Sequence, residues 1–431
     1  MTAPQSSAGK HAFTFVFITV LIDTIGFGII LPVMPDLLVE LTGRSVDQVS
    51  LIGGWLAFCY AIAQFIFGPV IGNLSDHYGR RPVLLFSLLA FGLDYAVMGL
   101  APTLSWLFLG RTIAGVAGAS YTTANACVAD ISPPDKRAQN FGMMGAAFGT
   151  GFILGPAIGG LLDDFGPRAP FFAAAALALL NVTYGYFVLP ETLAPESRRA
   201  FTWRRANTLG TLLQMRKYPI VLPMATAMFL WQLGHQSLPN IWAYYAKLKF
   251  GWSGKAIGMS LAYAGVTMII VQGGLVRMLL PRLGEKRAAF LGIAVAIAGY
   301  LGYAFASEGW MIYVVMTFAS LMGLAYPSMN GLMSRAVPSS SQGELQGGLA
   351  SVYSLTTIIG PLVMTQLFGY FASAAAPVYF PGAAFAFAAL LTVGCAVVFV
   401  RAARGVVDQR DDASERDIVL ETDAAPEPAV E

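Results

Sequence analysis

The stretch "GNLSDHYGRRPVLL", residues 72–85, interrupts an apolar chain with a cluster of charged and titratable side chains. These side chains are Asp76, His77, Arg80 and Arg81. Long apolar runs, 51–74 and 83–101, flank the cluster on both sides. A helix needs about 20 mainly apolar residues to cross a bilayer, and each run is about that long. The cluster is therefore predicted to be a water-exposed turn between two membrane helices.

The composition of the chain indicates that most of it is surrounded by lipid. Of 431 residues, 56% are hydrophobic and 12% are charged, and the mean hydropathy is +0.64. A typical soluble domain is about 25% charged. The formal net charge of +2 gives no reason to expect binding to nucleic acid. The three cysteines stand alone in apolar runs, without the spacing of a metal site, so we expect no metal and no resident cofactor.

Twelve stretches of the chain can be read as membrane spans. They lie at about 13–38, 51–74, 83–101, 104–128, 138–163, 170–190, 219–245, 255–280, 287–306, 309–335, 344–372 and 378–401. The predicted fold class is an all-α membrane protein with twelve transmembrane helices in two six-helix, pseudo-symmetric bundles. The predicted segments are a cytoplasmic N-terminus (1–12), an N-terminal bundle (13–190), a cytoplasmic linker (191–218), a C-terminal bundle (219–401) and a disordered acidic cytoplasmic tail (402–431).

Lysine and arginine in the loops predict how the chain is oriented, because cytoplasmic loops carry an excess of both. Fourteen of these residues lie on the side of the 72–85 turn, and five lie on the other side. We therefore expect a multi-pass protein of the cell inner (plasma) membrane with both termini in the cytoplasm.

The two halves of the sequence are related by a shift of 205 residues, which carries Pro133 to Pro338 and Pro156 to Pro361. Both halves begin on the same side of the membrane, so the repeat is parallel, and we expect a cavity between the halves near mid-membrane. The ionisable residues of the first half are not repeated: Asp23, Asp94 and Arg111 correspond to Met228, Gly299 and Met316.

Three charged residues are predicted to lie deep in the membrane. Asp23 is ten residues into the first span, or about 15 Å deep, which is half of a hydrocarbon core of about 30 Å. Asp94 and Arg111 reach a similar level on consecutive antiparallel helices, so they have the geometry for an ion pair. A static pair that locks two helices together remains an alternative to a functional one. Asp23 has no basic neighbour in sequence, and a lone buried carboxyl favours proton exchange.

Smaller polar groups on other spans are candidates for the wall of the cavity. Gln232, Gln236 and Asn240 are spaced by four and share one helix face. Any of these groups could equally form a hydrogen bond between helices, worth about 0.6 kcal/mol on average. The further candidates are Gln64, Tyr121, Asn125, Gln272, Asn330 and Tyr353.

At this point three motifs resemble the major facilitator superfamily. The stretch "GNLSDHYGRRP" matches its signature turn, G-x-L-(S/A)-D-x-x-G-R-R-P, at every fixed position, and "LGRTIAGVAGA" is similar to its fourth-helix motif with a buried Arg, here Arg111. The stretch "GAAFGTGFILGPAIGG" resembles the fifth-helix motif of its drug/proton antiporters, which implies an exporter. Its glycines allow close helix approach, and its proline kinks the helix. The residues that carry this antiporter motif are Gly145, Gly149, Gly151, Gly155, Pro156, Gly159 and Gly160.

From about Phe13 to Val400 the chain also resembles the tetracycline/proton antiporters, for example in "QGELQGGLASVYSLTTIIGPL". Two positions depart from that group. The group carries an acid in the ninth helix, where this chain has Ala296, and a His in the eighth helix, where it has Met268. Both positions are tied in that group to the handling of metal–tetracycline and protons. The resemblance therefore implies drug export without identifying tetracycline as the cargo.

The resemblance also implies a role for the turn, which in the superfamily latches the halves in the outward-open state. Asp76 would then face the start of the eleventh helix at Glu344, where a capping-box pattern and the helix dipole attract an anion. Topology alone explains the arginines but not the aspartate. Arg80 or Arg81 would reach an acid at the end of the fourth helix. The gating residues are thus Gly72, Asp76, Gly79, Arg80, Arg81, Asp130 and Glu344.

Together these observations predict a proton-coupled secondary antiporter that exports a lipophilic small molecule or drug by alternating access. Its partners would be the substrate, protons and the lipid bilayer; a divalent cation would enter only as a chelate of the substrate; and the chain would act as a monomer. An importer or facilitator of a sugar or other metabolite, and a non-transporting membrane sensor, are the alternatives. An enzyme is not indicated, because the sequence shows no nucleophile–base pair, metal cluster or phosphate loop.

Overall fold

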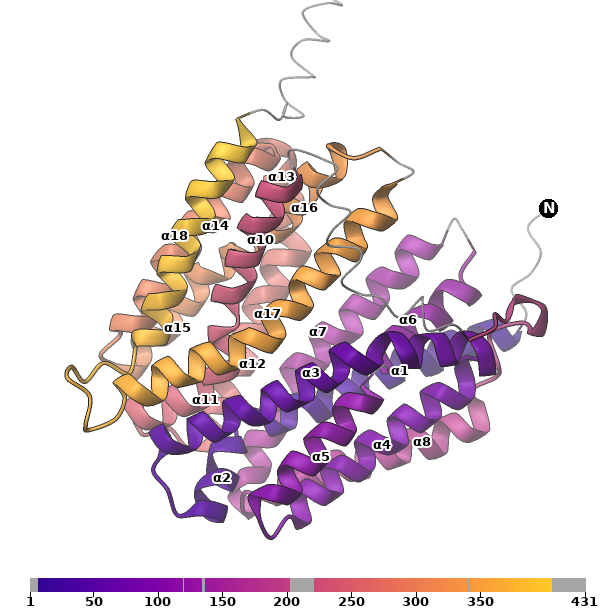
Figure 1. Cartoon of the computed structure of the whole chain (residues 1–431), viewed down its shortest axis with the longest axis horizontal. Coiled ribbons are helices and arrows are strands. Elements are labelled where there is room, and N and C mark those ends of the chain that lie inside the picture. The colour runs from indigo at the N-terminus through magenta and orange to yellow at the C-terminus, as the bar shows by residue number, and fades with distance from the viewer. Residues whose placement is uncertain (1–6, 119, 134–135, 202–220, 339–340, 405–431) are drawn as a thin grey trace, which may run out of the picture.

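The computed structural model describes residues 7–118, 120–133, 136–201, 221–338 and 341–404, and helices make up most of this part of the chain (Figure 1). The helices of the first half pack together as one lobe, called the N lobe. They are α1 (Ser7–Ile30), α2 (Met34–Thr42), α3 (Val46–Tyr78), α4 (Arg80–Leu100), α5 (Leu104–Ala117), α6 (Ser120–Ile131), α7 (Arg137–Leu162) and α8 (Ala169–Val188), with the short 3₁₀ turns η1 (Asp163–Phe165) and η2 (Pro195–Ser197).

The helices of the second half form the C lobe. They are α10 (Val221–His235), α11 (Ser237–Phe250), α12 (Gly254–Ile270), the π-helical segment η5 (Val271–Leu275), α13 (Val276–Leu283), α14 (Glu285–Phe305), α15 (Gly309–Ala319), the 3₁₀ segment η6 (Ser320–Leu324), α16 (Ala325–Arg335), α17 (Gln342–Phe371) and α18 (Ala383–Ala403). The predicted boundaries of the linker and the tail fall largely on residues outside the described ranges and stay predictions.

The structure is an all-α membrane protein. Ten helices within the described residues are long and apolar enough to cross a membrane. The other two predicted spans, 104–128 and 219–245, are each built from two shorter helices in succession, α5 with α6 and α10 with α11. This arrangement is consistent with the twelve predicted passages.

The sequence analysis was wrong about the continuity of two spans, and proline explains both breaks. The predicted helix 13–38 stops at Ile30, and α2 starts at Met34, because Pro32 has no N–H to bond the carbonyl of Gly28. The predicted helix 219–245 breaks at Gln236 for the same reason, because Pro239 cannot bond the carbonyl four residues earlier.

The predicted repeat recurs in the positions of the helices. The shift of 205 residues carries the bounds of α4, 80–100, onto those of α14, 285–305, and the first residue of α7, 137, onto that of α17, 342. It also carries Gly79 onto Gly284, and both adopt a backbone conformation that favours glycine, with φ and ψ of 109° and 161° and of 75° and 162°. The same sharp turn therefore precedes the third helix of each lobe.

The two lobes are packed against each other at one end. We call the end with the Gly79 turn the motif end, and the other, where α3 and α12 start, the opposite end. A Cβ added to Gly160 of α7 would lie 2.7 Å from the Gly254 carbonyl oxygen of α12. A Cβ added to Gly369 of α17 would lie 2.9 Å from the Asp47 carbonyl oxygen of α3. The opposite end is thus sealed by backbones of the two lobes in direct contact.

The same helices have open space around them toward the motif end. A Cβ added to Gly72 of α3, Gly145 of α7 or Gly343 of α17 would meet no atom within 4 Å. Figure 1 shows the cause, because α3 and α17 cross near the opposite end and diverge toward the motif end. The structure is therefore closed at the opposite end and open at the motif end.

Gly79→Ala is expected to destabilise the protein. Its φ of 109° and ψ of 161° lie in a region that costs other residues about 1–3 kcal/mol, and the new Cβ would lie 2.7 Å from the Glu191 carboxyl carbon. The measurement is the midpoint of thermal unfolding in detergent. Gly68→Ala, which adds a methyl to open space, is the control and should leave the midpoint unchanged or higher. Equal midpoints for the two variants would contradict this account of the turn.

Candidate functional site

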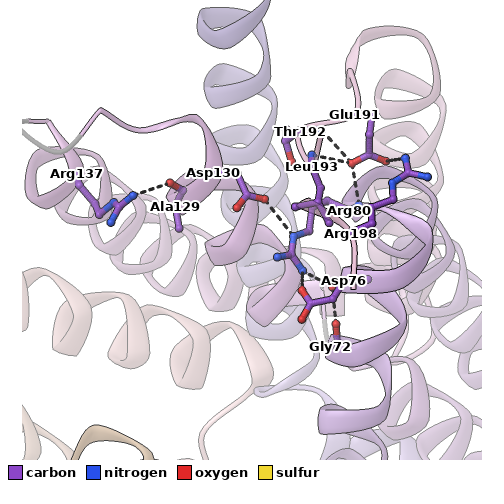
Figure 2. A network of polar contacts seen from close by, with 11 residues as sticks. Gly72, Asp76, Arg80, Ala129, Asp130, Arg137, Glu191, Thr192, Leu193 and Arg198 are labelled. Carbon is purple, nitrogen blue, oxygen red and sulfur yellow. Dashed lines mark hydrogen bonds and ion pairs between the residues drawn. The ribbon is translucent and has the colours of Figure 1, made fainter. Parts of the chain in front are cut away.

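The signature turn is held by a network of charges centred on Arg80 (Figure 2). Its guanidinium is 2.5 Å from Asp76 Oδ1 one turn earlier and 3.1 Å from Asp130 Oδ2 at the end of α6, and it donates to Ser75 Oγ at 2.7 Å. Asp130 is the predicted acid at the end of the fourth span, so the predicted contact is present, made by Arg80. Arg81 instead donates to the Tyr186 carbonyl oxygen at 2.6 Å.

Glu191, which the sequence analysis did not select, ties the segment after α8 to the turn. Its Oε1 accepts hydrogen bonds from the backbone N–H groups of Arg80 (2.9 Å), Thr192 (3.0 Å) and Leu193 (3.0 Å). A carboxylate is favoured there because the N-terminus of α4 leaves N–H groups unpaired and carries a partial positive charge. The Arg199 N–H also donates to the Asp76 carbonyl oxygen at 3.0 Å. The chain that leaves the N lobe is thus fastened to the turn.

The predicted approach of Asp76 to the start of α17 at Glu344 stays a prediction. In this structure the carboxylate of Asp76 pairs with Arg80 of its own turn. The lobes diverge at this end, and a Cβ on Gly343, beside Glu344, would meet no atom within 4 Å. A latch between the lobes at this position belongs to a state in which the motif end is closed.

The two charges on α4 and α5 form the predicted ion pair. The Arg111 guanidinium contacts the Asp94 carboxylate, whose side chain is fully buried, while that of Arg111 is 11% exposed. Gly110 leaves room for the carboxylate, since a Cβ there would lie 2.5 Å from Asp94 Oδ1. The guanidinium also lies 5.5 Å from the centre of the Tyr60 ring of α3, a cation–π contact.

Asp23 lies half-buried on α1 and belongs to the same cluster. It acts electrostatically on the hydroxyl groups of Tyr60 and Tyr95, which also feel Asp94 and Arg111. Tyr95 packs on α1 beside it, because a Cβ on Gly26 would lie 3.2 Å from the Tyr95 ring. We call Asp23, Asp94, Arg111, Tyr60 and Tyr95 the charged cluster. It joins α1, α3, α4 and α5 within the N lobe.

The predicted cavity residues of the N lobe adjoin this cluster in part. Gln64 Nε2 donates to the Gly118 carbonyl oxygen at 2.8 Å and to Tyr60 Oη at 3.4 Å. Asn125 is half-buried on α6. The side chain of Tyr121 lies outside the described part of the structure. Gln64 therefore pins the break between α5 and α6 next to the charged cluster.

The predicted cavity residues of the C lobe are spread over four helices. Asn240 Nδ2 donates to Gln236 Oε1 at 3.1 Å, so the four-residue spacing does bring them together, and Gln232 is half-buried one turn before. Asn330 Oδ1 accepts from Gln346 Nε2 at 3.1 Å. Gln272 on η5 and Tyr353 on α17 are exposed.

The antiporter motif lies on α7, between α1 of its own lobe and α12 of the other. One face carries Gly151, Gly155 and Gly159, and a Cβ on Gly155 would lie 2.6 Å from the Ile25 carbonyl oxygen of α1. The other face carries Pro156 and Gly160, which approach Gly258 and Gly254 of α12, and Gly149 lies near Ile269 at 3.8 Å. Gly145 faces open space. The motif thus packs one helix tightly on the charged-cluster helix α1 and on the other lobe at once.

Two ion pairs that the sequence analysis missed cross between the lobes at the opposite end. Lys247 Nζ of α11 contacts Asp36 Oδ1 of α2, with the side chains 26% and 22% exposed. Lys255 Nζ lies 3.8 Å from Asp164 Oδ2, and both of these side chains are more than half exposed. Within the described residues no group of three or more His, Cys, Asp or Glu has the arrangement of a metal site.

Comparisons with known proteins point in one direction. The family model described as Major Facilitator Superfamily matches residues 16–361. The chain is 39% identical over 364 residues to tetracycline resistance protein class C of Escherichia coli, covering 84% of this chain and 91% of that protein. It is 37% identical to the class G protein of Vibrio anguillarum, covering 82% and 89%.

Solved structures share the fold at low identity. The human organic anion transporter MFSD10 (TETRAN) aligns with a TM-score of 0.67 at 23% identity, covering 92% of this chain and 100% of the other. A D-xylose–proton symporter aligns with a TM-score of 0.71 at 17% identity, covering 90% and 97%.

Gly155→Ala is expected to lower the thermal stability measurably. The methyl group would press on the α1 backbone, and overpacking of this kind costs about 1–3 kcal/mol. The midpoint of thermal unfolding in detergent measures this effect. Gly145→Ala in the same helix, where the methyl meets open space, is the matched control. A midpoint of Gly155→Ala at or above that of Gly145→Ala would show that α7 and α1 do not pack as described.

Proposed function

The chain belongs to the major facilitator superfamily, and from that premise we propose that it is a proton-coupled antiporter that exports a lipophilic drug by alternating access. It is a multi-pass membrane transporter rather than an enzyme. Its relatives of 35–39% identity over most of the chain are tetracycline resistance proteins, which supports drug export. One chain supplies both lobes, so a monomer is sufficient, and the proton gradient drives the exchange without a resident cofactor.

The observation that carries this proposal is the charged cluster. Asp94 is fully buried and balanced by Arg111, whereas Asp23 is half-buried on the neighbouring helix. A buried charge inside a membrane protein costs several kcal/mol and is seldom without function. Asp23 is the group whose protonation changes the net charge of the cluster. Neutralising it changes the relative free energies of the inward-open and outward-open states, and that difference couples proton and drug.

In the proposed orientation the motif end faces the cytoplasm, as the excess of lysine and arginine there supports. The structure then corresponds to the inward-open state, ready to take up cargo from the cytoplasm or the inner leaflet. Conversion to the outward-open state requires that the contacts of α7 with α12 and of α3 with α17 open at the opposite end. At the motif end Asp76 then meets the start of α17 and replaces the broken seal.

The cargo proposed is a lipophilic drug class rather than tetracycline itself. Met268 on α12 is 39% exposed and Ala296 on α14 is fully buried, so neither position offers a ligand to a chelated metal ion. Polar contacts to a cargo would come from Gln232, Gln236 and Asn240. A susceptibility panel in a pump-deficient host that includes tetracycline identifies the cargo.

Asp23→Asn is expected to abolish coupling, because the amide cannot bind and release a proton. Drug-driven proton release from inverted vesicles measures it, and the variant should give the signal of vesicles without the protein. Asp164→Asn, on the exposed rim of the opposite end, is the control and should retain coupling. Coupling that persists in Asp23→Asn would remove this residue from the mechanism.

Asp36→Asn is expected to shift the protein toward the outward-open state, because it removes one partner of a partly buried ion pair between the lobes. We expect about 1 kcal/mol, or about a fivefold change in the ratio of the two states. Spin-label distances across the opposite end report this ratio. Lys255→Gln, which removes the exposed pair, should change it less. Equal distance distributions for Asp36→Asn and the unmodified protein would show that the pair does not hold the seal.

A further inference from the structure

His235 is a titratable side chain in the interior of the C lobe, away from the charged residues of the surrounding helices. It ends α10, about 21 Å along the helix from Val221 at 1.5 Å per residue. Helix α10 has no Asp, Glu, Lys or Arg. The helices packed on α10 carry such residues at their motif ends: Glu285, Lys286 and Arg287 on α14, Arg335 on α16, Glu344 on α17 and Arg401 on α18.

The structure gives His235 a specific partner. Its Nδ1 lies 3.3 Å from the hydroxyl oxygen of Tyr300 on α14, and its ring stacks on Trp231 with 10° between the planes. Tyr300 is fully buried and Trp231 is 4% exposed, so both hold the imidazole from a fixed position. His235 itself is exposed although Gly234 before it is buried. One ring nitrogen is therefore bonded to Tyr300, while part of the residue meets an accessible space.

The repeat places this pair opposite the charged cluster. The shift of 205 residues carries Tyr95 onto Tyr300 and the last residue of α1, Ile30, onto His235. Both tyrosines reach from the third helix of their lobe to the first, since Tyr95 packs on α1 at Gly26. In the N lobe the tyrosine stands next to Asp94; in the C lobe it meets an imidazole.

We propose that His235 is a second proton-binding residue of the transport cycle, positioned by Tyr300. The inference rests on the proposed antiport. In the neutral form the Tyr300 hydroxyl donates to Nδ1. In the charged form the imidazole carries the added proton, and Nδ1–H donates to the tyrosine oxygen. The positive charge then stands beside Gln232 and Gln236, weakens binding of a cationic or neutral cargo there and favours its release.

The first test is the pH profile of drug transport by inverted vesicles. An unperturbed imidazole titrates near pH 6.5, so an acid limb should appear below about that pH, with a change of up to about tenfold per unit. His235→Gln should keep transport above about pH 7.5 and lose this limb, while Tyr300→Phe should shift its midpoint. His11→Gln is the control and should retain the limb. An unchanged acid limb in His235→Gln overturns the proposal.

The second test reads the proton directly and does not depend on transport. Protein with isotopically labelled histidine carries three imidazoles, and the resonance missing in His235→Gln identifies the one of interest. It should titrate between about pH 5.5 and 7.5, with a midpoint that moves in Tyr300→Phe. If His235→Gln does not fold, the resonance that Tyr300→Phe perturbs identifies it instead. A resonance that does not titrate overturns this inference alone, whereas loss of drug-driven proton release with a titrating resonance overturns the antiport.

Discussion

Keeping a charged carboxylate inside a membrane protein requires a compensating positive charge, and Asp94 obtains it from Arg111 on the next helix. This ion pair is the constraint on which the arrangement of the N lobe depends. It fixes α4 against α5, places Tyr60 over the guanidinium and leaves Asp23 on α1 as the acid whose charge can change. A lobe with a balanced pair and one adjustable acid has two charge states, which is what coupling to a proton gradient requires.

Close backbone contact transmits that choice of charge state to the rest of the molecule. The glycines of α7 bring its backbone against α1, which carries Asp23, and against α12 of the other lobe. A displacement of α1 on protonation is therefore felt at the boundary between the lobes. At the motif end the network of Arg80, Asp76, Asp130 and Glu191 keeps the turn and the segment after α8 in one piece, so the N lobe moves as a unit.

Local patterns in the sequence were enough to predict the turn, the repeat, and the pairs Asp94–Arg111 and Arg80–Asp130, because each follows from helix length, helix order or a specific motif. The helix breaks near Pro32 and Pro239 were missed, although the prolines were visible, because apolar length was given more weight than the lost hydrogen bond. Glu191–Arg80 and Asp36–Lys247 join residues 111 and 211 apart. No local signal marks such contacts, since they depend on how whole lobes dock.

The central claim is that proton movement through the charged cluster drives movement of the cargo. The most direct measurement is the initial rate of drug uptake into proteoliposomes with purified protein and a series of imposed pH differences. The account predicts that uptake rises as the interior is made more acidic and stops when a protonophore removes the difference. A rate that stays the same at every imposed pH difference would contradict it.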